Sequence, residues 1–243
     1  MKKRLDVLLV ERGLAPSRQR AQAYILAGNV LVEDRPVTKA GTRFAEDVEI
    51  RVKGPDHGFV SRGGLKLQGA IEHFGVSIQD RTAADLGAST GGFSDCLLQH
   101  GAKRVYAIDV GYGQLAWKIR QDPRVVVMER TNARHLESLE EAVEIVVGDL
   151  SFISLRLILP AIRKISRPRA DCLLLVKPQF EAGKEAIRKG GVVEDADARA
   201  QAVAAVLDDA TKQGFECFGE MRSPIQGAKA GNIEHLIHIR TPA

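Results

Sequence analysis

Four charged side chains, widely separated along the chain, are of the types that can hold and move a proton: Lys66, Asp149, Lys177 and Glu234. Asp149 and Lys177 each follow a short apolar segment, and Glu234 lies at the start of the last such segment. Lysines and carboxylates are costly to bury alone, but they are tolerated when they pair with one another. In a shared site, an amine can accept a proton from a substrate while a carboxylate orients the amine.

A second group of candidate residues surrounds a glycine-rich stretch that could bind a cofactor. Glycines let the backbone turn tightly and come close to a ligand. Asp109, at the end of the next predicted strand, could accept hydrogen bonds from the ribose hydroxyls of an adenosine. NAD and S-adenosylmethionine sites both use this arrangement, and Asp85 favours S-adenosylmethionine because its carboxylate could hold the amino-acid part of that cofactor. The candidate cofactor residues are Asp85, Gly87, Ala88, Ser89, Thr90, Gly91, Gly92, Phe93 and Asp109.

These residues must be positioned by strands and helices that alternate from about Thr82 onward. Such alternation indicates parallel βαβ units and a doubly wound, Rossmann-like α/β sheet. Ligands of these sheets bind beyond the carboxyl ends of the strands, where Asp149 and Lys177 are expected. If the last strand runs antiparallel to the others, Glu234 at its beginning lies at the same edge. The predicted strands are 83–86, 104–108, 125–128, 144–147, 172–176, 216–221 and 233–239.

The first 59 residues differ from the rest and predict a small, separate α+β module. They contain 11 Lys and Arg against 8 Asp and Glu. The spacing of apolar residues predicts two short helices followed by a small sheet, over 5–12, 18–27, 30–32, 36–38 and 48–52. Ser17 is a suitable N-cap for the second helix. Arginines at a helix start suit phosphate groups, because the backbone amides there also attract anions.

Composition excludes several classes of protein. Apolar residues make up 44% and charged residues 27% of the chain, which argues against disorder. No apolar run approaches the ~20 residues of a membrane helix, and charges return too soon after the basic start for a signal peptide. Three widely spaced cysteines indicate a reducing, cytoplasmic setting. His235 and His238 would face opposite sides of a strand, so we expect no metal site.

Taken together, these segments resemble the TlyA (hemolysin A-like) family, which combines an S4 RNA-binding domain with an FtsJ-like methyltransferase domain. The S4-like residues are Arg4-Leu5-Asp6, Gly13, Ser17-Arg18-x-x-Ala21, Ile25 and Gly28-x-Val30-x-Val32. The methyltransferase motifs are Ser61-Arg62-Gly63-Gly64-x-Lys66-Leu67, Asp85-x-Gly87 to Phe93, Asp149 to Ser154, Lys177-Pro178-Gln179-Phe180-Glu181, Lys189-Gly190-Gly191-Val192-Val193, Ser223-Pro224-Ile225-x-Gly227 and Gly231-Asn232-x-Glu234. The resemblance implies an S4-like domain over 1–59 and a methyltransferase domain over 60–243.

The resemblance also implies an activity: methyl transfer from S-adenosylmethionine to the ribose 2′-hydroxyl of a cytidine in ribosomal RNA, with ribosomal subunits as partners. It implies a catalytic tetrad of Lys66, Asp149, Lys177 and Glu234, and RNA contacts from Arg4, Arg18 and Arg20. As a hypothesis, Lys177 accepts the hydroxyl proton as a neutral amine, which burial and repulsion from Lys66 both favour. Alternatively, Lys177 only steers the hydroxyl by its charge. Asp149 and Glu234 would orient the two amines.

Other methylation chemistries fit these residues less well. Methylation at pyrimidine C5 needs a nucleophilic cysteine, and no cysteine here ends a strand in a Pro-Cys context. Exocyclic amines are commonly methylated beside a Pro-Pro-aromatic turn, but the corresponding turn here, 149–152, contains no proline. Phe152 or Phe180 could stack on a target base. The other classes that remain open are a non-enzymatic RNA-binding or ribosome-assembly factor, a membrane-active hemolysin and an NAD-linked dehydrogenase.

Overall fold

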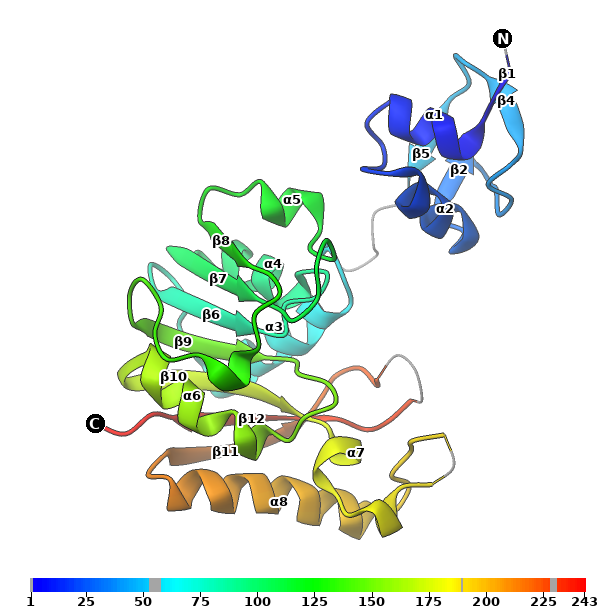
Figure 1. Ribbon diagram of the computed structural model, residues 1–243. Helices are drawn as coiled ribbons and strands as arrows, with labels where there is room; N and C mark the ends of the chain where they lie inside the picture. The colour runs from blue at the N-terminus through cyan, green and yellow to red at the C-terminus, as the bar shows by residue number, and fades with distance from the viewer. Residues whose placement is uncertain (1, 53–57, 189, 228–230) are drawn as a thin grey trace. The chain divides into compact units, whose positions relative to one another are not determined.

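The computed structural model describes residues 2–52, 58–188, 190–227 and 231–243. Lys189, which belongs to one of the motifs quoted above, lies outside the described residues. The chain divides into two compact units, Met1–Gly58 and Phe59–Ala243 (Figure 1). Each unit has its own hydrophobic core, so the two are described separately.

The N-terminal unit contains two short helices and two small antiparallel sheets. The helices are α1 (Leu5–Glu11) and α2 (Arg18–Leu26), and the strands are β1 (Lys2–Arg4), β2 (Val30–Val32), β3 (Arg35–Pro36), β4 (Arg43–Ala45) and β5 (Ile50–Val52). Leu5, Leu9 and Ile25 of the helices share a core with Val30 and Val32 of the sheet. Both predicted helices and the central strand are confirmed.

Seven strands form the main sheet of the second unit, in the order β11-β12-β10-β9-β6-β7-β8. Neighbouring strands from β10 to β8 are parallel, whereas β12 pairs antiparallel with both β10 and β11. The strands are β6 (Thr82–Leu86), β7 (Arg104–Ile108), β8 (Val125–Met128), β9 (Val143–Gly148), β10 (Ser166–Val176), β11 (Glu216–Arg222) and β12 (His235–Arg240). The predicted Rossmann-like sheet, mostly parallel with a reversed last strand, is therefore confirmed.

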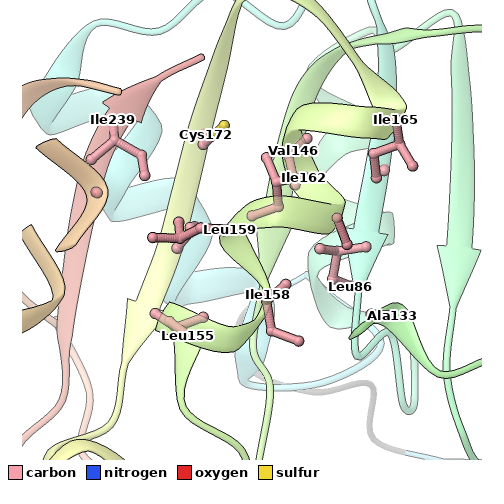
Figure 2. Packing of buried hydrophobic residues seen from close by; sticks show 14 of the residues in the cluster. Leu86, Ala133, Val146, Leu155, Ile158, Leu159, Ile162, Ile165, Cys172 and Ile239 are labelled. Atoms are coloured by element: carbon pink, nitrogen blue, oxygen red, sulfur yellow. The ribbon is translucent and has the colours of Figure 1, made fainter. Parts of the chain in front are cut away.

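Helices cover both faces of this sheet, which is why its central strands are almost entirely apolar. The helices are α3 (Gly63–Phe74), α4 (Gly92–Gln99), α5 (Trp117–Arg120), α6 (Leu159–Ile165), α7 (Pro178–Glu181) and α8 (Ala196–Lys212), with short 3-10 turns η1 (Ala133–His135), η2 (Leu155–Leu157) and η3 (Lys184–Ala186). α3 and α4 contribute to the core of one face, and α6 and α8 to that of the other. Leu159, Ile162 and Ile165 of α6 pack in one cluster with Val146 and Cys172 of the sheet (Figure 2). Within the described ranges, no helix combines the length and the apolar character that a membrane crossing requires.

In the main sheet, two strand boundaries differ from the prediction by more than one residue. β10 begins at Ser166 rather than Cys172, and its register against β9 shifts between Ser166 and Asp171. The added residues are mostly exposed and polar, so they carry no apolar signal. β12 begins at His235 rather than Ile233, so Glu234 lies in the loop immediately before the strand.

Candidate active site

The glycine-rich stretch forms a tight turn between β6 and α4. Gly87, Ser89 and Gly91 all have positive φ, the left-handed region that glycine adopts most easily. The backbone N–H groups of Gly87 and Ala88 donate to the carbonyl oxygen of Ile108, at 2.8 and 3.1 Å. A Cβ at Gly87 would lie 3.1 Å from the carbonyl oxygen of Asp149, so the turn passes directly beside the residue that follows β9.

Asp109 holds this turn in place. Its two carboxylate oxygens accept hydrogen bonds from the backbone N–H groups of Ser89, at 2.8 Å, and Gly111, at 2.6 Å. Asp109 is half-buried and does not line the cavity described below. The structure therefore places Asp109 against the glycine turn, and its predicted contact with an adenosine remains a prediction.

Asp85 is completely buried on β6 and also does not line the cavity. Its Oδ2 accepts a hydrogen bond of 2.6 Å from the Ser94 hydroxyl, whereas its Oδ1 has no hydrogen-bond partner among the described residues. Burial raises the pKa of Asp85 to about 7; the Ser94 hydrogen bond opposes this rise, and the charge of Asp149 adds to it. The predicted direct contact of Asp85 with a cofactor is therefore not visible in this geometry.

A cavity of about 640 Å³ opens beside the glycine turn. The predicted cofactor residues that line it are Gly87, Ala88, Ser89, Thr90, Gly92 and Phe93. All four predicted catalytic residues also line it: Lys66, Asp149, Lys177 and Glu234. Residues that are far apart in the sequence thus meet at one hollow along the carboxyl edge of the sheet.

The four charged side chains form a continuous chain of ion pairs. Lys66 Nζ lies 2.7 Å from Glu234 Oε2 and 3.3 Å from Asp149 Oδ2. The other Asp149 oxygen, Oδ1, lies 2.5 Å from Lys177 Nζ. Both lysines and Glu234 are buried, while the Asp149 side chain keeps 23% of its surface exposed. Two lysine amines therefore share two carboxylates.

This pairing determines the charge of Asp149. Burial alone would raise the pKa of its carboxyl group, but the charges of Lys177 and Lys66 outweigh burial. The net result is a pKa below the ordinary value, so Asp149 is ionised at neutral pH. A permanent carboxylate between two amines can orient both of them.

Each of the four residues is held by a different element. Lys66 projects from α3, and Asp149 follows β9, where its backbone N–H donates to the carbonyl oxygen of Leu86 at 3.1 Å. Lys177 caps the N-terminus of α7 after β10. Glu234 precedes the reversed strand β12, and its carbonyl oxygen accepts from the backbone N–H of Ser223 at 2.9 Å. The reversal of β12 is what brings Glu234 to this edge.

Two polar residues near the cluster were absent from the predicted site. Ser151 lines the cavity, and its Oγ lies 2.8 Å from Lys177 Nζ. Asn232 is buried; it donates to the Gly191 carbonyl oxygen at 2.8 Å and accepts from the Val193 backbone N–H at 3.1 Å. Both residues could have been predicted from their position in the sequence, because each lies two residues from a predicted catalytic carboxylate.

Two of the three predicted RNA-binding arginines of the N-terminal unit share one partner. Arg4 and Arg18 both contact the buried carboxylate of Asp6, at 2.9 and 3.1 Å, and the hydrogen bond from Arg4 is the largest cause that holds the pKa of Asp6 well below its ordinary value. The backbone N–H of Arg20 donates to the Ser17 hydroxyl, which confirms Ser17 as the N-cap of α2. RNA contact by these arginines remains a prediction.

The cavity fits S-adenosylmethionine better than a metal ion. A Cβ at Gly92 would overlap the Ser61 hydroxyl, and both residues line the cavity, so this position of the turn has room for glycine alone. Such a glycine turn allows a nucleoside cofactor to approach closely. The described residues contain no group of three or more His, Cys, Asp or Glu side chains that could hold a metal ion.

Comparisons with known proteins support the same assignment. Residues 59–241 match the family model of FtsJ-like methyltransferases, and residues 3–50 match that of the S4 domain. The chain is 47% identical to a 16S/23S rRNA (cytidine-2′-O)-methyltransferase TlyA of Mycobacterium tuberculosis, over 98% of this chain and 90% of the relative. It is 41% identical to Hemolysin A of Brachyspira hyodysenteriae, over 97% and 98% of the two chains.

Solved structures agree with these sequence matches. A suspected hemolysin from Streptococcus thermophilus superposes with a TM-score of 0.77 at 43% identity, over 99% of this chain and 89% of that one. A suspected S-adenosylmethionine-dependent methyltransferase from Listeria monocytogenes, at 17% identity and a TM-score of 0.56, shares the fold over 75% of this chain and 100% of that one. The chain therefore belongs to the TlyA (hemolysin A-like) family of FtsJ-like methyltransferases, enzymes that use S-adenosylmethionine as methyl donor.

Proposed function

We propose that this protein transfers a methyl group to the ribose 2′-hydroxyl of a cytidine in ribosomal RNA. The observation that carries the proposal is the ion-paired cluster of Lys66, Asp149, Lys177 and Glu234 in the cavity that the glycine turn also lines. The choice of cytidine and of ribosomal RNA is supported by the activity of the TlyA relatives. Ribosomal subunits are the proposed partners, and the cytoplasm is the proposed setting.

The protein must overcome the weak nucleophilicity of a ribose hydroxyl. When bound, S-adenosylmethionine supplies a methyl group that its sulfonium charge has already activated. The residues of the glycine turn that line the cavity, Gly87–Thr90, Gly92 and Phe93, would hold that cofactor. The remaining task of the chain is to align O2′ and to accept its proton.

The contacts distinguish the roles of the two lysines. Lys66 contacts two carboxylates, those of Asp149 and Glu234. Lys177 contacts a single carboxylate, which it shares with Lys66, and a neutral hydroxyl. Because the Lys177 amine has fewer carboxylate partners than that of Lys66, it is the proposed base. Lys66 would keep Asp149 and Glu234 in place.

Two aromatic rings at the cavity support a proposed contact with the target base. Phe152 and Phe180 both line the cavity, and their ring centroids lie 5.2 Å apart. Phe152 is 83% exposed although it is a large apolar side chain. Unstacked RNA bases bind against aromatic faces of this kind. We infer that this pair stacks on the cytosine while its ribose lies against the charged cluster.

The test is methyl transfer from tritiated S-adenosylmethionine to ribosomal subunits that lack the modification. Lys177→Ala should lower the transfer rate by at least ~10²-fold, the contribution expected of a positioned base. Its affinity for S-adenosylmethionine, measured by calorimetry, should stay within a few-fold of the wild-type value. Lys103→Ala, at an exposed position outside the cavity, is the matched control. Substantial turnover by Lys177→Ala would refute the assignment of the base.

The same assay separates the rival functions. A ribosome-assembly factor without enzymatic activity would give no transfer by the wild-type protein and no binding of S-adenosylmethionine. An NAD-linked dehydrogenase would bind a nicotinamide cofactor instead. A hemolysin would release dye from liposomes as a pure protein.

A further inference from the structure

Ser151 occupies an unusual place beside the proposed base. It lies two residues after Asp149, it lines the cavity, and its Oγ is 2.8 Å from Lys177 Nζ. The Lys177 amine thus has two oxygen partners on the same segment, Asp149 Oδ1 at 2.5 Å and Ser151 Oγ at 2.8 Å. A general role for Asp149 in orienting this amine does not explain why the second partner is present.

The geometry of an amine explains what a second partner can do. The Nζ atom is tetrahedral, with one position bonded to Cε and three left for hydrogens or a lone pair. A single acceptor sets the rotation about the Cε–Nζ bond but leaves two positions, and either can hold the second N–H or the lone pair of a neutral amine. A second acceptor assigns one of these positions to the N–H. With Asp149 and Ser151 each accepting one N–H, the last position on Lys177 is fixed in direction, and it carries the lone pair when the amine is neutral.

We propose that Ser151 is a positioning residue that aims the lone pair of Lys177 at the substrate hydroxyl. The inference rests on the proposed role of Lys177 as the base. In the transfer step, the O2′–H bond breaks as an N–H bond forms on Lys177, and Ser151 keeps its own proton throughout. The electron pair left on O2′ forms the bond to the methyl group as the methyl–sulfur bond breaks, and the sulfur keeps that bond's electrons.

The backbone around Ser151 is fixed in a way that suits this role. The next residue, Phe152, has a φ of 65°, a left-handed conformation that a bulky side chain rarely adopts. Ser154 and Leu155 follow shortly after Phe152 in the chain. The Ser154 hydroxyl and the Leu155 backbone N–H both donate hydrogen bonds to the buried Glu181, at 2.6 and 2.7 Å.

Glu181 belongs to the same short helix, α7, that Lys177 caps. The 151–155 segment is thus tied to the 177–181 segment at both ends: by Ser151 at the amine, and by Ser154 and Leu155 at the carboxylate. These hydrogen bonds at both ends of the segment fix the distance between Ser151 and Lys177. A serine that only contacts solvent would not require such a fixed distance.

The experiment is single-turnover methyl transfer to unmodified ribosomal subunits over a range of pH, with saturating S-adenosylmethionine. Ser151→Ala should transfer about 10- to 100-fold more slowly, the cost expected of a misdirected reacting group. Its KM for subunits and its melting temperature should match those of the wild type. The deficit should have the same size at every pH of the range, because the orientation of the amine does not depend on pH. Ser151→Thr, which keeps the hydroxyl, should recover most of the rate, and Ser77→Ala at an exposed position is the control.

Several results would overturn the inference. A wild-type rate in Ser151→Ala, or a defect confined to KM, would show that the hydroxyl does not direct the amine. A deficit that vanishes at high pH would mean that Ser151 changes the protonation of Lys177 and not its orientation. An equally slow Ser151→Thr would mean that the hydroxyl is not the operative group. Lys177→Ala is measured in parallel: if it remains active, the proposed base is wrong, whereas an inactive Lys177→Ala with a normal Ser151→Ala refutes only the orienting role.

Discussion

The buried carboxyl group of Asp85 gives a sharp prediction about stability. Its pKa rises from an ordinary 3.8 to about 7, because the carboxylate form would be buried with one oxygen unpaired. Since the folded-state pKa is raised, the favourable contribution of the protonated group is complete below pH 3.8 and is lost as the pH rises to about 7. A shift of this size corresponds to about 4 kcal/mol of unfolding free energy, of which about 3 kcal/mol is lost between pH 5 and pH 8.

Asp85→Asn should remove this loss, because the amide does not ionise. The free energy of unfolding is measured by urea titration at pH 5 and pH 8, in the absence of cofactor. Trp117, the single tryptophan, lies in the Phe59–Ala243 unit, so its fluorescence reports the unfolding of that unit alone. Between the two pH values, the wild type should lose about 3 kcal/mol more than Asp85→Asn.

Taking the difference between the two pH values cancels any constant effect of the amide on stability. It also cancels every other titrating group that the two proteins share. Asp208→Asn, which changes an exposed carboxylate on α8, is the matched control and should follow the wild type. If the two stability differences agreed within about 1 kcal/mol, the Asp85 carboxyl group would not be protonated near neutral pH, and this reasoning would be wrong.

Three further variants test other parts of the structure. Glu234→Gln removes one of the two carboxylates that contact Lys66. The rate of methyl transfer should fall about 10²-fold, and the affinity for the cofactor should not change. A near-normal rate would contradict a role of Glu234 in the cluster. Asn232→Ala loses its hydrogen bond to the Gly191 carbonyl. The KM for subunits should therefore rise about tenfold in steady-state assays. An unchanged KM would show that this hydrogen bond is not needed for substrate binding. Asp6→Asn weakens the charge-assisted hydrogen bonds of Asp6 to two arginines. The free energy of unfolding of the N-terminal unit, measured by hydrogen exchange, should fall by about 1–3 kcal/mol. Unaltered protection of the backbone amides would refute this expected loss of stability.

The site could be predicted from the sequence largely because of one topological rule. Side chains that follow parallel strands gather at one edge, which placed Asp149 and Lys177 together. Glu234 could be added because the last strand was expected to reverse, as β12 does. The side-chain contacts could not be predicted in this way, because they depend on rotamers and on short loops. The hydrogen bond from Lys177 to Ser151 is such a contact.

Other features had no signal in the pattern of apolar residues. The pair β1 and β4 is short, and its strands expose most of their side chains, so neither shows the alternation that predicts a strand. The complete burial of Asp85 was equally hidden, because a carboxylate at a strand end normally reaches the ligand side. Its burial follows from the α4 helix that packs over it, where Ser94 supplies its hydrogen bond.

The measurement that tests the central claim most directly is to locate the transferred methyl group. Ribosomal subunits are labelled with tritiated S-adenosylmethionine by the wild-type protein, and their RNA is digested to nucleosides and separated. The charged cluster predicts that the label appears in 2′-O-methylcytidine and that Lys177→Ala gives almost none. Label on a base, or equal labelling by Lys177→Ala, would contradict the account of how this site works.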